Sequence, residues 1–219
     1  MGKSFLITGT DTGIGKTFIG RCLIRYFTET NIRVVPFKPV ETGVINDQPE
    51  DGLALLREAK IEEDIDRVVP YRFELPASPL VASRKEEKPI DLTKILETFN
   101  LLRSSYDLVI VEGAGGICVP ITESITYLEL AKILNIPVVV VARSKLGTIN
   151  HTLLTTRIAR AYGIRVIAVI LNQYEDLDYV EKTNPIVIEE LEGIKTFVVE
   201  VLKEPKPLKE IGDYILANI

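Results

Sequence analysis

The chain has 219 residues, and 46% of them are hydrophobic, which is enough to form a substantial core. A formal net charge of −5 and an isoelectric point near 5.2 argue against nucleic acid or an anionic membrane as the main partner. The longest apolar run, residues 136–142, is too short to span a membrane, and the first apolar stretch is too short for a signal peptide, so we expect a soluble, cytoplasmic protein.

Short β-branched runs alternate along the chain with segments of helical periodicity. Strands are predicted over residues 4–8, 33–40, 107–113, 137–142, 165–172 and 196–201. Helices are predicted over residues 16–28, 51–59, 91–103, 126–134, 149–162 and from about 207. Residues 61–90 hold four prolines and are predicted to be irregular, with the charge run 84–88 in a solvated loop. Pro36 predicts that the second strand bends or lies at a sheet edge.

The strands that end near residues 113, 142 and 172 are apolar almost throughout, as expected of strands covered on both faces. Such strands in alternation with helices predict an α/β fold, with a mostly parallel sheet and helices on both faces. The sequence has no internal repeat or linker, so we expect a single domain over residues 1–219. Ligands bind such sheets at the carboxyl ends of the strands, where the unusual polar residues of this chain gather.

The two cysteines, Cys22 and Cys118, lie in apolar stretches, and neither belongs to a C-x-x-C pair. Helical periodicity places Cys22 on an apolar face together with Phe18 and Leu23. Two buried free thiols and a reducing compartment are therefore predicted.

A glycine-rich loop, GTDTGIGKT at residues 9–17, joins the first strand to the first helix. Gly13 and Gly15 allow several backbone N–H groups to point inward, and the helix start adds its positive end. Lys16 can reach the outer phosphates of a nucleotide, and the Thr17 hydroxyl can bind Mg²⁺. The loop is one residue longer than the common phosphate-binding pattern, because its first glycine is Gly9 where the pattern places it at position 10.

Two other interpretations of this loop are weaker. An ordinary strand-to-helix turn explains the glycines but not the Gly-Lys-Thr sequence at the helix start. A dinucleotide-binding loop would have its third glycine at position 18, which is Phe18. The sequence therefore predicts a P-loop NTPase-like domain.

Two carboxylates are candidate metal ligands. Glu112 ends a covered strand, where a carboxylate is costly unless it meets a charge or a metal. Metal ligation is favoured for Glu112 over an ion pair with Lys16 or Lys38. Asp51 begins a predicted helix, and the sequence alone does not decide between helix capping and metal binding.

Further polar residues lie at the same edge of the predicted sheet. Lys38 either stabilises developing negative charge or is a surface lysine. Gly147 and the residue after it lead into a helix and form a second possible anion site. His151 is a possible base, but packing or capping is favoured, and Asn172 either contacts a base edge or lies in a turn.

Together these residues resemble the dethiobiotin synthetases, the ATP-dependent carboxylases of biotin synthesis. The resemblance covers most of the chain, and the order and spacing of its motifs are more specific than any one of them. The motifs are GTDTGIGKT (9–17), KPVETG (38–43), PASP (76–79), VEGAGG (111–116), KLGTINHTLLT (145–155) and Asn172. The family's loop normally has the extra residue.

The resemblance implies a ligase, a homodimeric and Mg²⁺-dependent enzyme. It implies that ATP drives the carboxylation of 7,8-diaminononanoate with CO₂ and the closure of the ring to dethiobiotin. It implies a phosphate cradle of Thr12, Gly13, Ile14, Gly15, Lys16 and Thr17. It implies Mg²⁺ ligands at Thr17, Asp51 and Glu112, and catalytic cations at Lys38 and Lys16. Further nucleotide contacts are implied at Glu112, Gly113, Ala114, Gly115 and Asn172. Substrate contacts are implied at Thr42 and, across the dimer interface, at Gly147, Thr148, Ile149 and Asn150.

The sequence departs from the family pattern at three places. Gly13 stands where many members carry an acidic residue, and Gln173 stands where an aspartate is common. Residues 196–205, which are implied to close over the adenine and ribose, match poorly. We therefore expect only a weak preference for ATP over other nucleoside triphosphates.

Two rival functions use a similar nucleotide loop. A partitioning or metallocluster-maturation ATPase usually has the loop K-G-G-x-G-K-[ST], but this chain has Asp11 and Thr12 at the first two positions. An amidoligase of cobalamin synthesis would carry a glutaminase domain, for which this chain has no room. The gated ATPase is the stronger rival.

Overall fold

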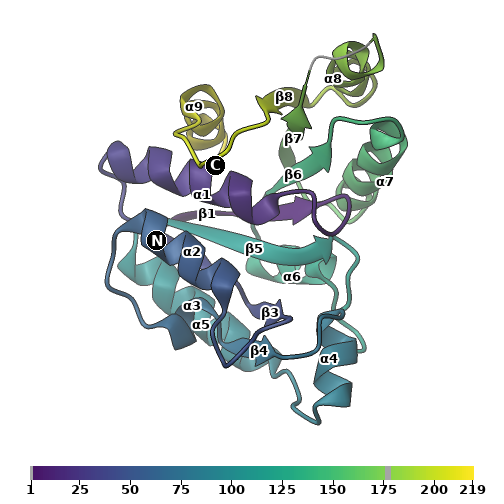
Figure 1. The fold of residues 1–219 in the computed structure, drawn as a ribbon. Coiled ribbons are helices and arrows are strands. Elements are labelled where there is room, and N and C mark those ends of the chain that lie inside the picture. The colour runs from purple at the N-terminus through teal and green to yellow at the C-terminus, as the bar shows by residue number, and fades with distance from the viewer. Residues whose placement is uncertain (1, 176–178) are drawn as a thin grey trace.

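A six-stranded, entirely parallel sheet forms the centre of the computed structural model, which describes residues 2–175 and 179–219 (Figure 1). Its strand order is β2-β5-β1-β6-β7-β8. The strands are β1 (Lys3–Gly9), β2 (Val34–Phe37), β5 (Leu108–Gly116), β6 (Val138–Arg143), β7 (Val166–Tyr174) and β8 (Lys195–Glu200). The predicted α/β fold class is confirmed, and β2 lies at an edge, as Pro36 indicated.

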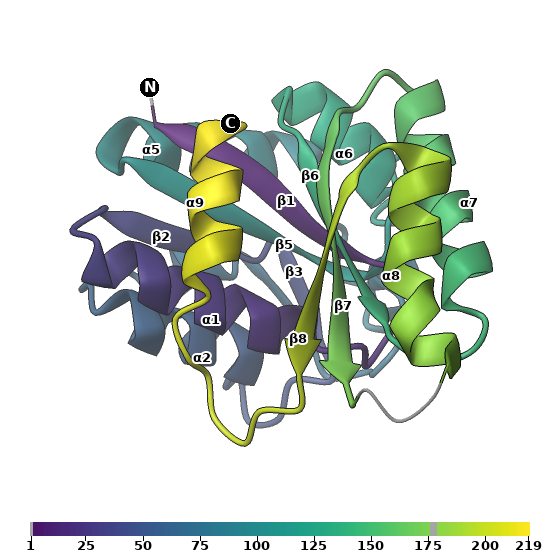
Figure 2. The same ribbon diagram turned by 90° about the horizontal axis from the view of Figure 1, so that it is seen from above.

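Helices cover both faces of this sheet (Figure 2). The helices of the main layers are α1 (Lys16–Glu29), α2 (Glu50–Ala59), α5 (Leu92–Ser105), α6 (Tyr127–Leu134), α7 (Thr148–Ala161), α8 (Tyr179–Glu192) and α9 (Lys209–Ala217). One apolar cluster joins alternate strand residues to α1, α2 and α9, and a second cluster joins the other strand residues to α5, α6, α7 and α8. Successive side chains of a strand point to opposite faces, so each covered strand contributes to both clusters.

The predicted strand over residues 33–40 is wrong in its extent. The chain leaves the main sheet after Phe37, and the Lys38 amide donates to the carbonyl of Val68. A separate two-stranded parallel sheet then forms from β3 (Val40–Thr42) and β4 (Tyr71–Phe73). Pro39 separates the two strands, since it has no N–H to donate to a ladder.

The prediction that residues 61–90 are irregular is also wrong, because they contain β4 and two short helices, α3 (Ile65–Val68) and α4 (Pro79–Lys85). These elements are too short to show periodicity, but their starts carry local signals. Asp64 caps α3 through the Asp66 amide, and Pro79 is the first residue of α4. Part of the charge run 84–88 is therefore helical, and Glu86 accepts a hydrogen bond from the Leu75 amide at 2.9 Å.

The helix α8, whose interior contains Pro185, was not among the predicted elements. Proline removes one backbone hydrogen bond and normally disfavours a helix, but the tertiary packing of Ile188 against the sheet overrides it. Cys22 is buried as predicted, whereas Cys118 is exposed and that prediction is wrong. No helix among the described residues is long and apolar enough to cross a membrane.

Candidate active site

The glycine-rich loop leaves the carboxyl end of β1 and turns directly into α1. Gly15 is the N-cap of α1 with φ 89°, a left-handed conformation that favours glycine. A β-carbon at this position would also lie 2.1 Å from Asn172 Nδ2. The helix has no side-chain cap and no acidic residue in its first turn, so its first N–H groups are available to an anion.

Lys16 is folded back over the loop, where its Nζ donates to the Asp11 carbonyl at 3.1 Å. Burial lowers the pKa of the Lys16 ammonium, and the nearby positive charge of Lys38 acts in the same direction, while Glu112 opposes both. The side chain is buried and faces the same cavity as Lys38. Two lysines, from different elements, therefore place positive charge at one end of the sheet.

Lys38 is the centre of an ionic cluster in which Lys38 and Glu112 are buried and the Asp51 side chain is 46% exposed. Its Nζ lies 2.6 Å from Glu112 Oε1 and 2.7 Å from Asp51 Oδ2, and the Thr17 hydroxyl donates to the same Glu112 oxygen at 2.8 Å. Burial alone would lower the pKa of the Lys38 ammonium, but the two carboxylates outweigh burial and raise it above its usual range. Lys38 is therefore a buried cation paired with two carboxylates, and the surface alternative for it is wrong.

Asp51 belongs to the first turn of α2 but does not cap the helix. The N-cap residue is Pro49, and no side chain of the helix start makes a cap bond. Burial raises the pKa of the Asp51 carboxyl, but the positive charge of Lys38 and the hydrogen bond from Lys38 lower it by more, so the net shift is downward. The carboxylate of Asp51 is thus kept ionised toward Lys38 and Thr17.

Thr17, Asp51 and Glu112 bring three oxygen-bearing side chains to one side of Lys38 and the glycine-rich loop. Glu112 Oε2 is buried and has no hydrogen-bond partner, which leaves one acceptor of the cluster unsatisfied. Among the described residues, no group of three or more His, Cys, Asp or Glu side chains could hold a metal by itself. Mg²⁺ commonly takes one or two carboxylates together with phosphate and water oxygens, so the donor set fits a nucleotide-bound Mg²⁺.

A cavity of about 630 Å³ joins these residues. Its walls come from the glycine-rich loop, the ends of β2 and β5, β3, and the segment before α4. The predicted residues that line it are Thr12, Gly13, Gly15, Lys16, Thr17, Lys38, Thr42, Asp51, Glu112, Gly113, Ala114 and Gly115. Ile14 is buried behind the loop, and Ala77 and Ser78 of the PASP segment also line the cavity.

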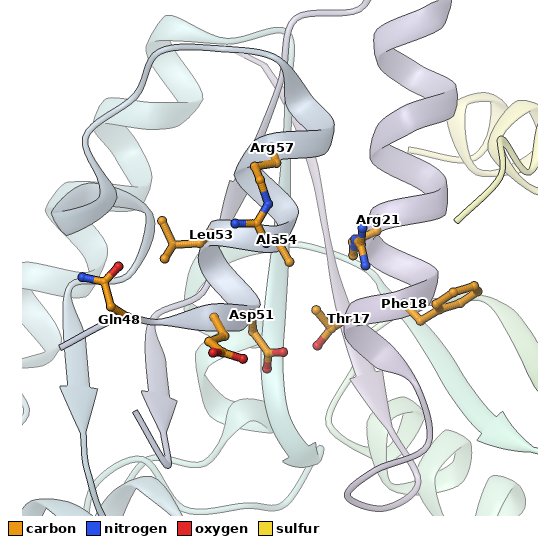
Figure 3. A pocket seen from close by; sticks show the side chains of 9 residues that line it. Thr17, Phe18, Arg21, Gln48, Asp51, Leu53, Ala54 and Arg57 are labelled. Atoms are coloured by element: carbon orange, nitrogen blue, oxygen red, sulfur yellow. The ribbon is translucent and has the colours of Figure 1, made fainter. Parts of the chain in front are cut away.

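A second cavity of about 620 Å³ lies between α1 and α2 (Figure 3). Thr17 and Asp51 line both cavities, and Arg21 of α1 and Arg57 of α2 line the second one farther along the helices. Arg21 is paired with Glu58 at 2.8 Å. The gap between the two helices therefore opens directly beside the candidate metal ligands.

Asn172 lies in β7 and not in a turn, so the turn alternative is wrong. Its side chain is buried, and its Nδ2 donates to the Ile14 carbonyl at 3.0 Å. This bond ties the end of β7 to the glycine-rich loop, at the position where Gly15 leaves space for the amide. In this structure Asn172 holds the loop in place.

Four of the residues predicted to contact the substrate do not line the cavity that contains Lys38. Gly147, with φ 94°, is the N-cap of α7, and Thr148, Ile149 and Asn150 form its first turn. The helix has no side-chain cap. His151 is exposed in the same turn, which does not fit the favoured packing or capping role. The start of α7, which is suited to binding an anion, therefore does not belong to the Lys38 cavity of the same chain.

Glu41 is a cavity residue that sequence analysis missed. Its carboxylate is buried and accepts hydrogen bonds from the backbone amides of Asp51 and Gly52. Burial raises the pKa of this carboxyl above its usual range. The sequence did contain a signal, because Glu41 is a charged residue of the motif KPVETG and lies between the candidate site residues Lys38 and Thr42.

Comparisons with known proteins decide the family. The family model described as an AAA domain matches residues 3–204. A protein of Aquifex aeolicus named ATP-dependent dethiobiotin synthetase is 42% identical over 217 residues, which cover 97% of this chain and 97% of that protein. The chain belongs to the dethiobiotin synthetase family. The family resemblance and the predicted enzyme class, a ligase, are thereby confirmed.

Other dethiobiotin synthetases are similarly close. The protein of that name from Thermodesulfovibrio yellowstonii is 38% identical and covers 100% of this chain and 96% of the relative. The one from Methanocaldococcus jannaschii is 45% identical and covers 81% of this chain and 84% of the relative. These names do not favour the gated ATPase as the function of this chain.

Solved structures show the fold alone. The MinC:MinD cell division complex of Aquifex aeolicus contains a chain with a TM-score of 0.59 and 16% identity, covering 93% of this chain and 87% of its own. The MinD cell division protein of that organism gives a TM-score of 0.56 and 17% identity, covering 97% of this chain and 85% of its own. The chain thus shares a P-loop NTPase fold with proteins of very different sequence.

Proposed function

We propose that this dethiobiotin synthetase family member closes 7,8-diaminononanoate and CO₂ to dethiobiotin, with ATP converted to ADP and phosphate. The observation that carries the proposal is that the buried Lys38 ammonium and the glycine-rich loop line the same cavity. That space has room for the reacting end of a diamine next to the terminal phosphate of a nucleotide. The names of the relatives give ATP and the product dethiobiotin, and the diamine and CO₂ come from the family resemblance.

The proposed reaction has three steps. One amine of the substrate attacks CO₂ and loses a proton, which gives a carbamate. A carbamate oxygen then attacks the γ-phosphorus of ATP, which gives a mixed carbamic–phosphoric anhydride and ADP. The second amine attacks the anhydride carbonyl, loses a proton to water and expels phosphate, which closes the ring.

The residues of this chain act by positioning and by charge neutralisation. The loop amides and Lys16 hold the phosphates, and Lys38 faces the carbamate and the transferred phosphoryl group. Because two carboxylates keep Lys38 protonated, it acts as a fixed cation and not as a base. The amine that attacks is itself the nucleophile, so no carboxylate is needed to activate it.

A divalent cation has a defined place in this proposal. Thr17, Asp51 and Glu112 would hold Mg²⁺, and the metal would neutralise charge on the bound phosphates. The unpartnered Glu112 Oε2 and the low pKa of Asp51 support these ligands. Thr42 lines the cavity from β3 and would contact the substrate amine end.

We also propose that the chain works as a homodimer. Gly147, Thr148, Ile149 and Asn150 would bind the substrate carboxylate in the neighbouring subunit, because they lie outside the cavity of their own chain. The uncapped start of α7 is suited to an anion. Leu146 and Leu154 are 88% and 63% exposed beside it, which supports a protein surface covering this end.

The test is phosphate release with Mg-ATP and bicarbonate, in the presence and absence of 7,8-diaminononanoate. Release is expected to require the diamine and to yield dethiobiotin. Equal hydrolysis with and without the diamine would support the gated ATPase in place of the synthetase. Size measurement with and without the substrate checks the homodimer.

A further inference from the structure

Glu41 carries an unusual pair of hydrogen bonds. Its Oε1 accepts from the Asp51 amide at 3.0 Å, and its Oε2 accepts from the Gly52 amide at 2.9 Å. Asp51 and Gly52 are the second and third residues of α2, where a helix has backbone donors without intrahelical partners. A carboxylate from another element therefore takes the place of an N-terminal cap.

The start of α2 needs such a cap from outside. Pro49, at the N-cap position, has no N–H and no side chain that can accept a hydrogen bond. Glu41 satisfies two of the remaining unpaired donors of the first turn, and its negative charge suits the positive end of the helix. Without Glu41 no side chain of the described residues would accept from these two amides.

The two elements joined in this way are both fixed. Glu41 lies in β3, whose residues pair with β4 on either side of it. At Gly52 a β-carbon would lie 2.2 Å from Val69 Cγ2, so the helix start packs closely on the segment that leads into β4. Glu41 thus fixes the first turn of α2 relative to β3.

Asp51 is the residue whose side chain depends on that turn. Its carboxylate projects from the start of α2 toward Thr17 of α1, across the gap between the two helices (Figure 3). It also lies 2.7 Å from Lys38 Nζ. A shift or fraying of the first turn of α2 would move this carboxylate away from Thr17 and Glu112.

We infer that Glu41 is a positioning residue that caps α2 and so holds Asp51 in place for the divalent cation of the active site. The inference rests on the proposed function, in which Asp51 is a ligand of that cation. Glu41 also lines the cavity, but both of its oxygens are already bonded to backbone amides. In this inference its effect is exerted through α2 and not by contact with the substrate.

The experiment measures ADP binding by calorimetry, in Mg²⁺ and in EDTA. In Glu41→Ala the tightening of ADP binding by Mg²⁺ is expected to fall about fivefold to tenfold, while the affinity in EDTA is unchanged. Glu41→Gln keeps the volume of the side chain and one acceptor, so it is expected to lose a smaller part of the Mg²⁺ effect on ADP binding. It replaces the alanine variant in the test if that variant does not fold. A full Mg²⁺ effect in both variants would overturn the inference.

Asp91→Ala is the matched control, because Asp91 caps α5 through the Thr93 amide at 2.8 Å and does not line the cavity. It is expected to lower the melting temperature as a lost cap does and to leave the Mg²⁺ effect intact. A loss of the Mg²⁺ effect in this control as large as that in Glu41→Ala would overturn the inference, because general destabilisation would then explain both.

A second cap provides a rescue test. Pro49→Ser in the Glu41→Ala background gives α2 a hydroxyl at its N-cap, and it is expected to restore both the melting temperature and the Mg²⁺ effect. Recovery of the melting temperature alone would overturn the inference and assign Glu41 to direct ligand contact. If Asp51→Ala keeps the full Mg²⁺ effect, the proposed metal site fails, whereas loss in Asp51→Ala but not in Glu41→Ala removes only the inference.

Discussion

The Lys38 ammonium lies 2.6 Å from Glu112 Oε1, and both side chains are almost entirely buried. A pair of this kind differs from a surface ion pair, since each charge is costly to bury without the other. The same pair is the centre of the proposed active site. Stability and activity can therefore be separated by changing one partner or both.

Lys38→Met is expected to destabilise the protein by about 3–5 kcal/mol, because it leaves the Glu112 carboxylate buried without its cation. Lys38→Met combined with Glu112→Gln removes both charges and is expected to recover most of this stability. Neither variant is expected to release phosphate in the diamine-dependent assay. Urea unfolding and the phosphate assay measure the two properties independently. Full activity in the double variant would show that the buried charges serve only the fold.

Glu112→Gln alone tests the metal assignment. The amide keeps the size of the side chain but removes the negative charge, so half-saturation by Mg²⁺ is expected to shift about tenfold or more upward in the phosphate assay. Glu192→Gln is the matched control, since Glu192 is also buried and pairs with Arg157 at 2.9 Å in another part of the fold. Unchanged Mg²⁺ dependence in Glu112→Gln would leave only the ion-pair role.

Gly15→Ala tests the fit between the loop and β7. The added methyl group would meet Asn172 Nδ2 at 2.1 Å, and the backbone would be held at φ 89°. We expect a loss of about 1–2 kcal/mol from the left-handed backbone alone, a further loss from the clash, and a large drop in nucleotide affinity.

Gly163→Ala supplies the comparison for this variant. Gly163 has φ 77° and nothing within 4 Å of an added β-carbon, so only the backbone strain applies. Its stability loss is expected to be the smaller, with nucleotide affinity unchanged, as measured by urea unfolding and calorimetry. Equal losses in the two variants would mean that the loop moves aside from Asn172 at no cost.

The two thiols are expected to react differently with iodoacetamide. Cys22 is completely buried in α1, and Cys118 is exposed after β5. Mass spectrometry of the native protein is expected to find one adduct, at Cys118, and denatured protein is expected to give two. The Cys118→Ser variant should give none in the native state. Native labelling of Cys22 would contradict the packing of α1 against the sheet.

Local patterns were enough to predict the main strands, the glycine-rich loop and the candidate ligands. The loop and α1 are adjacent in sequence, so their chemistry is visible in nine residues. The contact of Lys38 with Asp51 depends on how α2 packs beside β2, and no local pattern specifies that packing. The helix α8 was missed because Pro185 opposes its local propensity, and tertiary contacts of Ile188 decide the outcome.

Nucleotide selectivity is expected to be weak. Asn172, the residue implied to contact the base, uses its Nδ2 to hold the Ile14 carbonyl, and Gly13 offers no side chain to the ligand. A site that makes few hydrogen bonds to the base discriminates poorly between bases. We expect kcat/KM for GTP and CTP to lie within about tenfold of the value for ATP in the diamine-dependent phosphate assay, a difference of about 1.4 kcal/mol or less. A preference for ATP of about a hundredfold or more would mean that residues 196–205 or the partner subunit contact the base directly.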